Sequence, residues 1–423
     1  MPYNTYDDEI VLIESQASIG DIIKIECNEL YYTGMLMPRY QYTNQKNIVI
    51  KLHNGYNVGL PIKEITKIQV IKKKSKIDSI SYSIRKNDAA RPKILLLSTG
   101  GTIASSLDYI TGAVSPTFSS DDIKKLIPEI SQFANIDTEV VFLESSENIL
   151  PAHWKRIAEI IITKKNLQYS GIIISHGTDT MHYTAAYLSF ALVGFPIPIV
   201  LVGSQRSLDR PSSDAAMNLI STIQFITKYK SQGVFVAMHH GGNDDVIACH
   251  IGTRVRKNHT SKRSAFQTIG GKPAFLINDG HITKNTDKVF NHKYEAKLNL
   301  DPRVALIKYY PGYNPELLEY VIKCNYRAII FEGTGLGHVG NILYKNIKHA
   351  NEKNIFLGMT SQCINGFIQM NVYESGRKLI NLGITPLNMI PETALVKAMW
   401  ALGNSHNIQE MKKIMLKNVA FEF

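Results

Sequence analysis

The chain has 423 residues, 44% of them hydrophobic and 20% charged, so we expect two or three globular domains whose cores need no metal or disulfide. Its four scattered cysteines form no CxxC pair, and it has neither a secretory leader nor an apolar run near the roughly 20 residues of a membrane span, which predicts a cytoplasmic protein. A net charge of +11, from 47 Lys and Arg against 36 Asp and Glu, weakly favours an anionic partner such as nucleic acid, although a general lysine-rich bias gives the same excess.

Residues 1–72 contain short β-type runs separated by turns. The runs lie at 21–26, 31–38, 47–52, 56–60 and 65–71. The Asn-Gly pair of the HNG segment at 53–55 favours a type I′ hairpin. Because the strands are short and closely spaced, we expect a small β-barrel.

Residues 73–92 form the expected linker. A basic run, KKKSK at 72–76, stands at its start, and a polar stretch that ends in Pro92 closes it. The run fits a solvated linker, and it also fits a strip that contacts tRNA.

From Lys93 onward, apolar runs alternate with helix-like segments. The apolar runs, which are typical of buried parallel strands, lie at 94–97, 172–174, 199–202 and 234–237. The helix-like segments lie at 154–165, 183–193 and 214–229. This alternation predicts an α/β domain with a parallel sheet, which we place at 93–300, with loops and short strands from 239 on.

The alternation resumes in the last part of the chain. Strands fit at 304–307, 328–331 and 355–359, and helices fit at 316–323, 342–351 and 392–402. We therefore expect a smaller C-terminal α/β domain at 301–423.

The first segment with reactive groups, STGGTIA at 98–104, follows the first strand of the larger domain. Ligands bind beyond the carboxyl ends of strands in an open parallel sheet, and two glycines allow a close backbone approach. Thr99 and Thr102 supply hydroxyls, and nearby backbone N–H groups could line an oxyanion hole. A tight turn between strand and helix is the alternative, whereas a phosphate-binding loop is excluded because the chain has no GxxxxGK[ST] motif.

The second such segment, HGTDT at 176–180, also follows a strand and leads into a helix. Asp179 or Thr180 could simply cap that helix. Two threonine-rich loops at the ends of two strands of one sheet can, however, converge on one pocket. The pair therefore predicts a site that uses hydroxyl groups.

A threonine hydroxyl needs a neighbouring base before it can act as a nucleophile. The basic stretch TRVRKNHTSKR at 253–263 offers several candidates, and residue chemistry alone does not choose among them or exclude a basic surface loop. His239, His240 and His250 lack metal-binding spacing, so we expect no metal site. A Ser-His-Asp hydrolase is disfavoured because no GxSxG motif occurs.

Together these motifs resemble the L-asparaginase family, whose two signatures match STGGTIA at 98–104 and HGTDTM at 176–181. The segments VGSQR at 202–206 and DAAMNL at 214–219 also look familial. By matching motif position, the resemblance implies that Thr102 is the nucleophile, that Thr178 and Asp179 form the second catalytic pair, and that Lys257 is the catalytic lysine.

The resemblance also implies three substrate-binding residues. Tyr109 matches the tyrosine of a mobile loop that closes over the substrate. Ser146 and Glu147 fall where the family holds the α-amino and α-carboxylate groups of the substrate. Free asparaginases tend to carry Gln where this chain has Glu147, and they lack its N-terminal β region.

Those departures resemble the family of D-type amidase subunits of archaeal glutamyl-tRNA(Gln) amidotransferases. The segments that carry this likeness are GMLMPR at 34–39, KLHNGYN at 51–57, SEN at 146–148 and RVRKNHTS at 254–261. This resemblance implies an amidase that releases ammonia from glutamine or asparagine. A partner, the E-type subunit, would use ATP and Mg to convert Glu-tRNA(Gln) to Gln-tRNA(Gln), and this chain would hold no cofactor of its own.

The resemblance further implies a homodimer within a heterotetramer, because asparaginases of this class place their sites at a subunit interface. Two alternatives stay open. The chain could be a free L-asparaginase with an accessory β domain, or a tRNA-binding scaffold with an inactive amidase site.

Overall fold

The computed structural model describes residues 15–37, 47–52, 57–73, 91–101, 105–107, 114–116, 127–206, 213–229, 232–243, 245–288 and 290–423. The expected hairpin turn at 53–55 and most of the expected linker, residues 74–90, lie outside this part of the chain. Two of the expected site residues, Thr102 and Tyr109, lie outside it as well.

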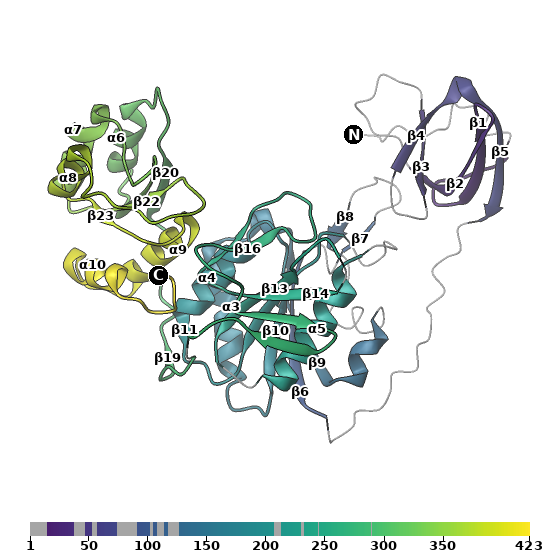
Figure 1. The fold of residues 1–423 in the computed structure, drawn as a ribbon, viewed down its shortest axis with the longest axis horizontal. Coiled ribbons are helices and arrows are strands. Elements are labelled where there is room, and N and C mark those ends of the chain that lie inside the picture. Colours follow the sequence, from purple (N-terminus) through teal and green to yellow (C-terminus); the bar gives the residue numbers. More distant parts are fainter. Residues whose placement is uncertain are drawn as a thin grey trace.

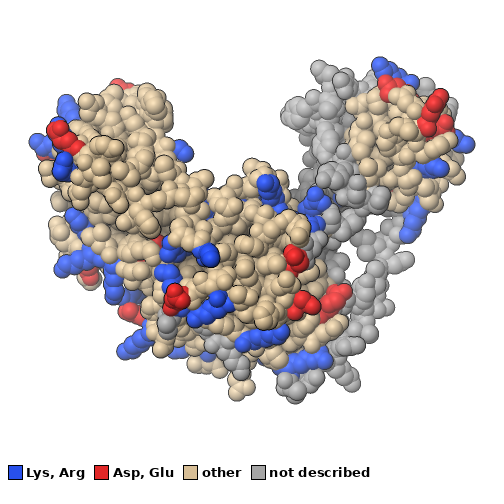
Figure 2. Space-filling view, in the orientation of Figure 1, with Lys and Arg blue, Asp and Glu red and all other residues tan. Residues whose placement is uncertain are grey.

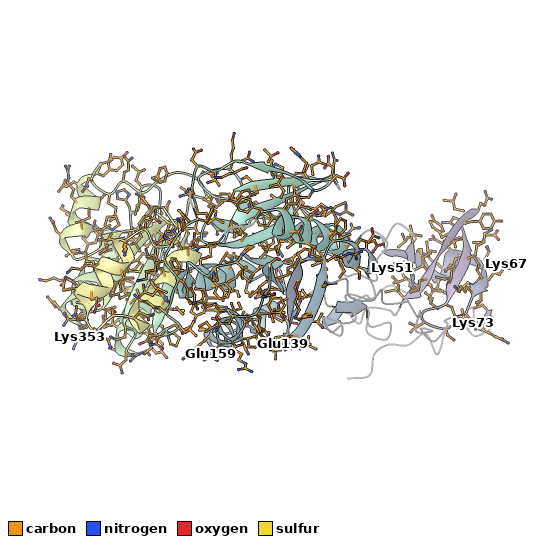
Figure 3. All side chains as sticks on the ribbon, turned by 90° about the horizontal axis from the view of Figure 1, so that it is seen from below. Lys51, Lys67, Lys73, Glu139, Glu159 and Lys353 are labelled. Atoms are coloured by element: carbon orange, nitrogen blue, oxygen red, sulfur yellow. The ribbon has the colours of Figure 1, made fainter. Side chains whose placement is uncertain are left out.

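Five antiparallel strands form a small barrel-like sheet near the N-terminus (Figure 1). In the order β4-β3-β2-β1-β5 they are β4 (Asn57–Pro61), β3 (Asn47–Leu52), β2 (Leu30–Met37), β1 (Ile22–Cys27) and β5 (Ile65–Lys72). Alternate residues of β1, namely Ile23 and Ile25, are buried in an apolar core. Lys67 points outward from the barrel (Figure 3). The β-barrel prediction is therefore confirmed.

An eight-stranded sheet forms the centre of the molecule (Figure 1). In sheet order its strands are β18 (His281–Lys284), β17 (Phe275–Asn278), β14 (Val246–Ile251), β13 (Val234–His239), β12 (Ile199–Val202), β10 (Gly171–Ser175), β6 (Lys93–Gly100) and β9 (Asn135–Glu144). The five strands from β13 to β9 are parallel. Four of them, β13, β12, β10 and β6, are the strands that the apolar runs predict.

Two features of this sheet differ from the expectation. Strands β14, β17 and β18 extend it in antiparallel fashion, and they come from the region of loops and short strands after residue 239. Strand β9 at the other edge is not among the expected strands, although it contains the apolar run VVFL at 140–143. Within β9 only Ile136 is buried, as fits a strand at the edge of the sheet.

Helices cover both faces of the central sheet. Helix α5 (Ala215–Lys228) packs on one face with the 3-10 helix η3 (Pro128–Gln132). Helices α3 (Pro151–Thr163) and α4 (Met181–Ala191) pack on the other. Helix α4 is buried almost all round because α9 (Pro391–Gly403), from the C-terminal region, covers its outer side.

The C-terminal region is a second α/β layer. Its parallel sheet has the order β20 (Val304–Lys308), β21 (Ala328–Gly333), β22 (Phe356–Ser361) and β23 (Thr385–Pro386). Its other helices are α6 (Pro315–Lys323), α7 (Tyr344–Glu352), α8 (Glu374–Asn381) and α10 (Ile408–Leu416). Because α9 shares one apolar core with α4, this region packs directly against the central one. The predicted α/β architecture is confirmed.

Charges of both signs are mixed on the face of the molecule that Figure 2 draws. On the face drawn in Figure 2, Lys and Arg lie over the central and C-terminal regions with Asp and Glu among them. None of the helices in the described ranges is long and apolar enough to cross a membrane.

Candidate active site

The two threonine-rich loops leave the sheet from adjacent parallel strands. Ser98 on β6 pairs with Ser175 on β10, so the two motifs start at the same level of the sheet. Thr99 is fully buried, and its hydroxyl donates to the carbonyl of Ser175 at 2.8 Å. Of the hydroxyls expected in the first loop, that of Thr99 therefore ties the two strands together instead of facing a substrate.

Glycines let the two loops meet backbone to backbone. Gly100 and Gly101 have φ values of 100° and 82°, a region that disfavours any residue with a Cβ. A Cβ on Gly101 would stand 2.2 Å from the backbone nitrogen of Gly177. Thr178 follows Gly177 directly, so it lies next to this backbone contact.

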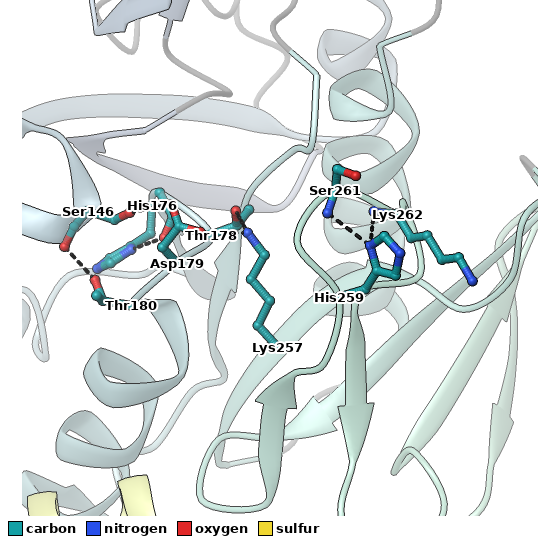
Figure 4. Close-up of polar contacts among 10 residues, drawn as sticks. Ser146, His176, Thr178, Asp179, Thr180, Lys257, His259, Ser261 and Lys262 are labelled. Atoms are coloured by element: carbon teal, nitrogen blue, oxygen red, sulfur yellow. Dashed lines mark hydrogen bonds and ion pairs between the residues drawn. The ribbon is translucent and has the colours of Figure 1, made fainter.

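Lys257 links both functional groups of the second loop (Figure 4). Its Nζ donates to Thr178 Oγ1 at 2.8 Å and lies 2.8 Å from Asp179 Oδ1. The lysine side chain is only 9% exposed, whereas that of Asp179 is 67% exposed. Thr178 is buried. The amine of Lys257 thus lies at the hydroxyl of Thr178, and the carboxylate of Asp179 holds this amine from the solvent-exposed side.

Ser146 joins this group from the other side. It begins the 3-10 helix η4 (Ser146–Asn148), which follows β9, and it is buried. Its hydroxyl lies 3.5 Å from Asp179 Oδ2, and its carbonyl accepts a 2.7 Å hydrogen bond from Thr180 Oγ1. Thr180 stands at the N-cap position of α4 without capping it through its side chain, because its hydroxyl is engaged by Ser146.

The structure therefore brings together four of the seven expected site residues: Ser146, Thr178, Asp179 and Lys257. Glu147 lies beside Ser146 on η4 with an exposed side chain. Thr102 and Tyr109 are outside the described residues, so their roles stay predictions.

A third loop completes the site, and the sequence reasoning assigns it no role. Gly203 follows β12, and a Cβ there would meet Thr178 Cγ2 at 3.0 Å. Asp214 fixes this loop, since its carboxylate accepts the backbone N–H groups of Gln205 and Arg206 at 3.0 Å. The sequence does contain a signal for this loop, because DAAMNL at 214–219 is one of the segments that look familial. The residue pattern of that segment does not, however, reveal that Asp214 and Asn218 support the loop.

Asn218, one turn along α5, reinforces the same loop. Its Nδ2 donates to the carbonyl of Gly203 at 2.9 Å, and its Oδ1 lies 2.7 Å from His239 Nδ1. All three residues are buried, so they form a fixed support behind the loop.

His176 is part of the scaffold and not of the acid–base chemistry. It is fully buried, and burial lowers its pKa to about 4, so the ring is neutral at physiological pH. Its Nδ1 lies 2.7 Å from the carbonyl of Gly177, and its Nε2 lies 2.8 Å from Thr184 Oγ1. Within the described ranges, no group of three or more His, Cys, Asp or Glu could hold a metal ion.

Comparison with known proteins agrees with this geometry. Residues 93–290 match the N-terminal asparaginase domain, residues 303–415 the glutaminase/asparaginase C-terminal domain, and residues 17–71 the GatD N-terminal domain. The D-type subunit of the glutamyl-tRNA(Gln) amidotransferase from Pyrococcus abyssi is 40% identical over 97% of this chain and 96% of its own length. The corresponding protein of Pyrococcus furiosus is 43% identical over 98% and 97%.

The chain belongs to the GatD family of glutamyl-tRNA(Gln) amidotransferase subunits. This chain also matches solved structures of L-asparaginases. The thermostable L-asparaginase from Thermococcus kodakarensis matches with a TM-score of 0.72 and 33% identity, over 78% of this chain and 99% of that one. L-asparaginase I from Vibrio cholerae matches with a TM-score of 0.70 and 26% identity, over 79% and 99%.

Proposed function

We propose that this chain hydrolyses the side-chain amide of glutamine or asparagine and supplies the ammonia to a tRNA-dependent amidotransferase. The contact of Lys257 with both Thr178 and Asp179 carries the chemical part of this proposal, since it pairs a buried hydroxyl with an amine. Family membership over nearly the whole chain supports the tRNA-dependent part.

The proposed reaction is an acyl transfer through a threonine ester. The hydroxyl oxygen of Thr102 attacks the amide carbon, and its proton passes by way of Thr178 to Lys257. Backbone N–H groups of the two loops stabilise the oxyanion. The nitrogen then takes up a proton and leaves as ammonia, and water hydrolyses the ester, releasing glutamate or aspartate and restoring Thr102.

In this proposal Ser146 and Glu147 hold the α-amino and α-carboxylate groups of the substrate, and Tyr109 closes over it. The exposed carboxylate of Asp179, close to Ser146, is placed to help bind an ammonium group. The proposed chemistry needs no cofactor in this chain. A partner of the E type uses ATP and Mg to activate the glutamate on tRNA, and two copies of each chain form the assembly.

The decisive experiment measures ammonia release from glutamine and from asparagine by the full chain. The assay is run with the chain alone and then with the partner, ATP and Glu-tRNA(Gln). Stimulation that requires the complete mixture supports the proposal. Full turnover of asparagine by the isolated chain, without stimulation, identifies a free asparaginase instead. Absence of ammonia under every condition identifies an inactive scaffold.

A further inference from the structure

The strand that carries Lys257 is held from behind by the C-terminal region. Strand β15 (Val255–Lys257) is short and pairs with β16 (Phe266–Thr268). Because side chains alternate along a strand, Arg256 points away from the side where Lys257 meets Thr178. What Arg256 contacts therefore bears on where Lys257 is held.

Arg256 meets the first turn of helix α9. Its Nε lies 3.0 Å from Glu392 Oε1, and the two side chains are 25% and 10% exposed. Glu392 follows Pro391, the first residue of α9, so its carboxylate also lies at the positive end of the helix dipole. A buried ion pair adds little net stability to a fold, but it fixes geometry, because separating the charges leaves each without compensation.

The neighbouring residue of α9 holds the same segment at a second point. Thr393 Oγ1 donates to the carbonyl of Thr253 at 2.8 Å, and both threonines are buried. Thr253 in turn donates from its own hydroxyl to the carbonyl of Ala420 at 2.8 Å. Two successive residues of the C-terminal region thus hold both ends of the stretch from 253 to 256, immediately before Lys257.

The charge of Glu392 also acts on Tyr183, near the start of α4. Tyr183 lies in the first turn of α4, directly after the loop of Thr178 and Asp179, and burial together with the charges of Glu392 and Glu332 raises its pKa to about 12. Within the described part of the chain, Glu392 Oε2 is buried without a hydrogen-bond partner, and burial raises the pKa of this carboxyl. A buried acceptor without a hydrogen bond lowers the stability of the fold, so the presence of Glu392 at this position calls for a functional explanation.

We infer that Glu392 is a positioning residue for amide hydrolysis: with Thr393 it holds β15 through Arg256 and Thr253, and so sets Lys257 against Thr178 and Asp179. This inference rests on the catalytic role proposed for Lys257. A displacement of about 1 Å in a catalytic group can lower a rate about 10²-fold, so a contact outside the pocket can control the rate in this way. The C-terminal region thereby becomes part of the catalytic apparatus without touching the substrate.

The test uses kcat and KM for ammonia release by the full chain with variants of this contact. Glu392→Ala removes the acceptor, and we expect kcat to fall about 10-fold to 100-fold while KM changes less than about threefold. Glu392→Gln keeps an oxygen for Arg256 Nε, so it should recover a large part of kcat. The matched control is Glu319→Ala on α6, whose carboxylate contacts Asn346 and His349 within the C-terminal region.

A double-mutant cycle separates positioning from a general loss of structure. If Glu392 acts through Arg256, Arg256→Met with Glu392→Ala should lose no more kcat than the worse single variant. Each assay is run well below the variant's melting midpoint. A kcat for Glu392→Ala within twofold of the control, or additive losses in the double variant, would overturn the inference. Lys257→Met separates failure of the proposed active site from failure of the role inferred for Glu392. If Lys257→Met stays active, the proposed active site is wrong. If Lys257→Met is inactive but Glu392→Ala is fully active, only the role of Glu392 is wrong.

Discussion

A Cβ on Gly101 would stand 2.2 Å from the backbone nitrogen of Gly177, so the two threonine-rich loops touch where neither can carry a side chain. Gly101 also has a φ of 82°, which adds backbone strain to the collision if Ala replaces it. Gly177 precedes Thr178, so this contact bears on where Thr178 is held.

Gly101→Ala should push the two loops apart and lower the rate of ammonia release about 10²-fold, since the reacting groups lose their alignment. The measurement is kcat with saturating asparagine or glutamine. Gly271→Ala is the matched control, because a Cβ there meets nothing within 4 Å among the described residues. Equal activity in the two variants would mean that loop contact does not set the geometry.

Lys257→Met and Thr178→Val should each lower kcat about 10²-fold to 10⁴-fold, as expected when a positioned proton-transfer group is removed. Thr102→Val should abolish turnover, because it removes the proposed nucleophile. Lys262→Met serves as control, since Lys262 belongs to the same basic stretch and is exposed, directed away from Thr178 (Figure 4). Near-normal turnover in any of the first three variants would remove that residue from the mechanism.

Thr99→Val should distinguish a structural threonine from Thr102 and Thr178, for which we propose catalytic roles. The variant loses the hydrogen bond to the carbonyl of Ser175, which should lower the free energy of unfolding by about 1 kcal/mol. Denaturant unfolding followed by tryptophan fluorescence checks the stability, and an ammonia assay checks the rate. We expect kcat to change far less than in Thr178→Val; an equally large loss would place Thr99 in the reaction.

Acid should destabilise the fold through three buried histidines. Burial lowers the pKa of His176 to about 4 and those of His182 and His250 to about 3, against an ordinary value of 6.5. Below pH 6.5 these histidines therefore bind protons in the unfolded chain but stay neutral in the folded chain. Their contribution to stability is complete above pH 6.5 and declines as the pH falls toward 4, by about 1.4 kcal/mol per pH unit for each histidine.

The melting midpoint between pH 7 and pH 4.5 measures this effect. His250→Gln should flatten the acid slope, because one buried histidine is gone. His406→Gln, at an exposed position, should leave the slope unchanged. If the two variants show the same slope as the parent chain, acid sensitivity has another source.

Sequence patterns sufficed for most of the secondary structure. The five strands of the barrel and the helices α3, α4 and α5 follow their expected ranges to within a few residues, because alternation and continuous apolar runs are local signals. The edge strand β9 is not among the expected strands, and the antiparallel strands β14, β17 and β18 lie where only loops and short strands without bounds were expected. Whether such a segment pairs at a sheet edge, and in which direction, depends on contacts with a distant strand, and a local run such as VVFL at 140–143 of β9 does not record them.

The candidate site divides in the same way. Composition and motif spacing point to threonine-rich loops at strand ends, and the resemblance picks out Lys257 from a stretch with several basic residues. The contacts of Lys257 with Thr178 and Asp179 span 79 and 78 positions of sequence, so no local pattern encodes them. The sequence could name these residues only through the resemblance, whereas the fold shows them touching.

By itself, then, the sequence determined the periodic elements, the glycines that permit close backbone approach and the residue types able to perform amide hydrolysis. Only the tertiary structure decided that the hydroxyl of Thr178 contacts Lys257, whereas the hydroxyl of Thr99 forms a hydrogen bond within the sheet. Only it showed that Glu392 and Thr393, far beyond Arg256 and Thr253 in the sequence, reach back to hold the strand of the lysine. The physical reason is that hydrogen bonds and ion pairs act over a few ångströms, and distant segments come that close only when the cores between them have packed.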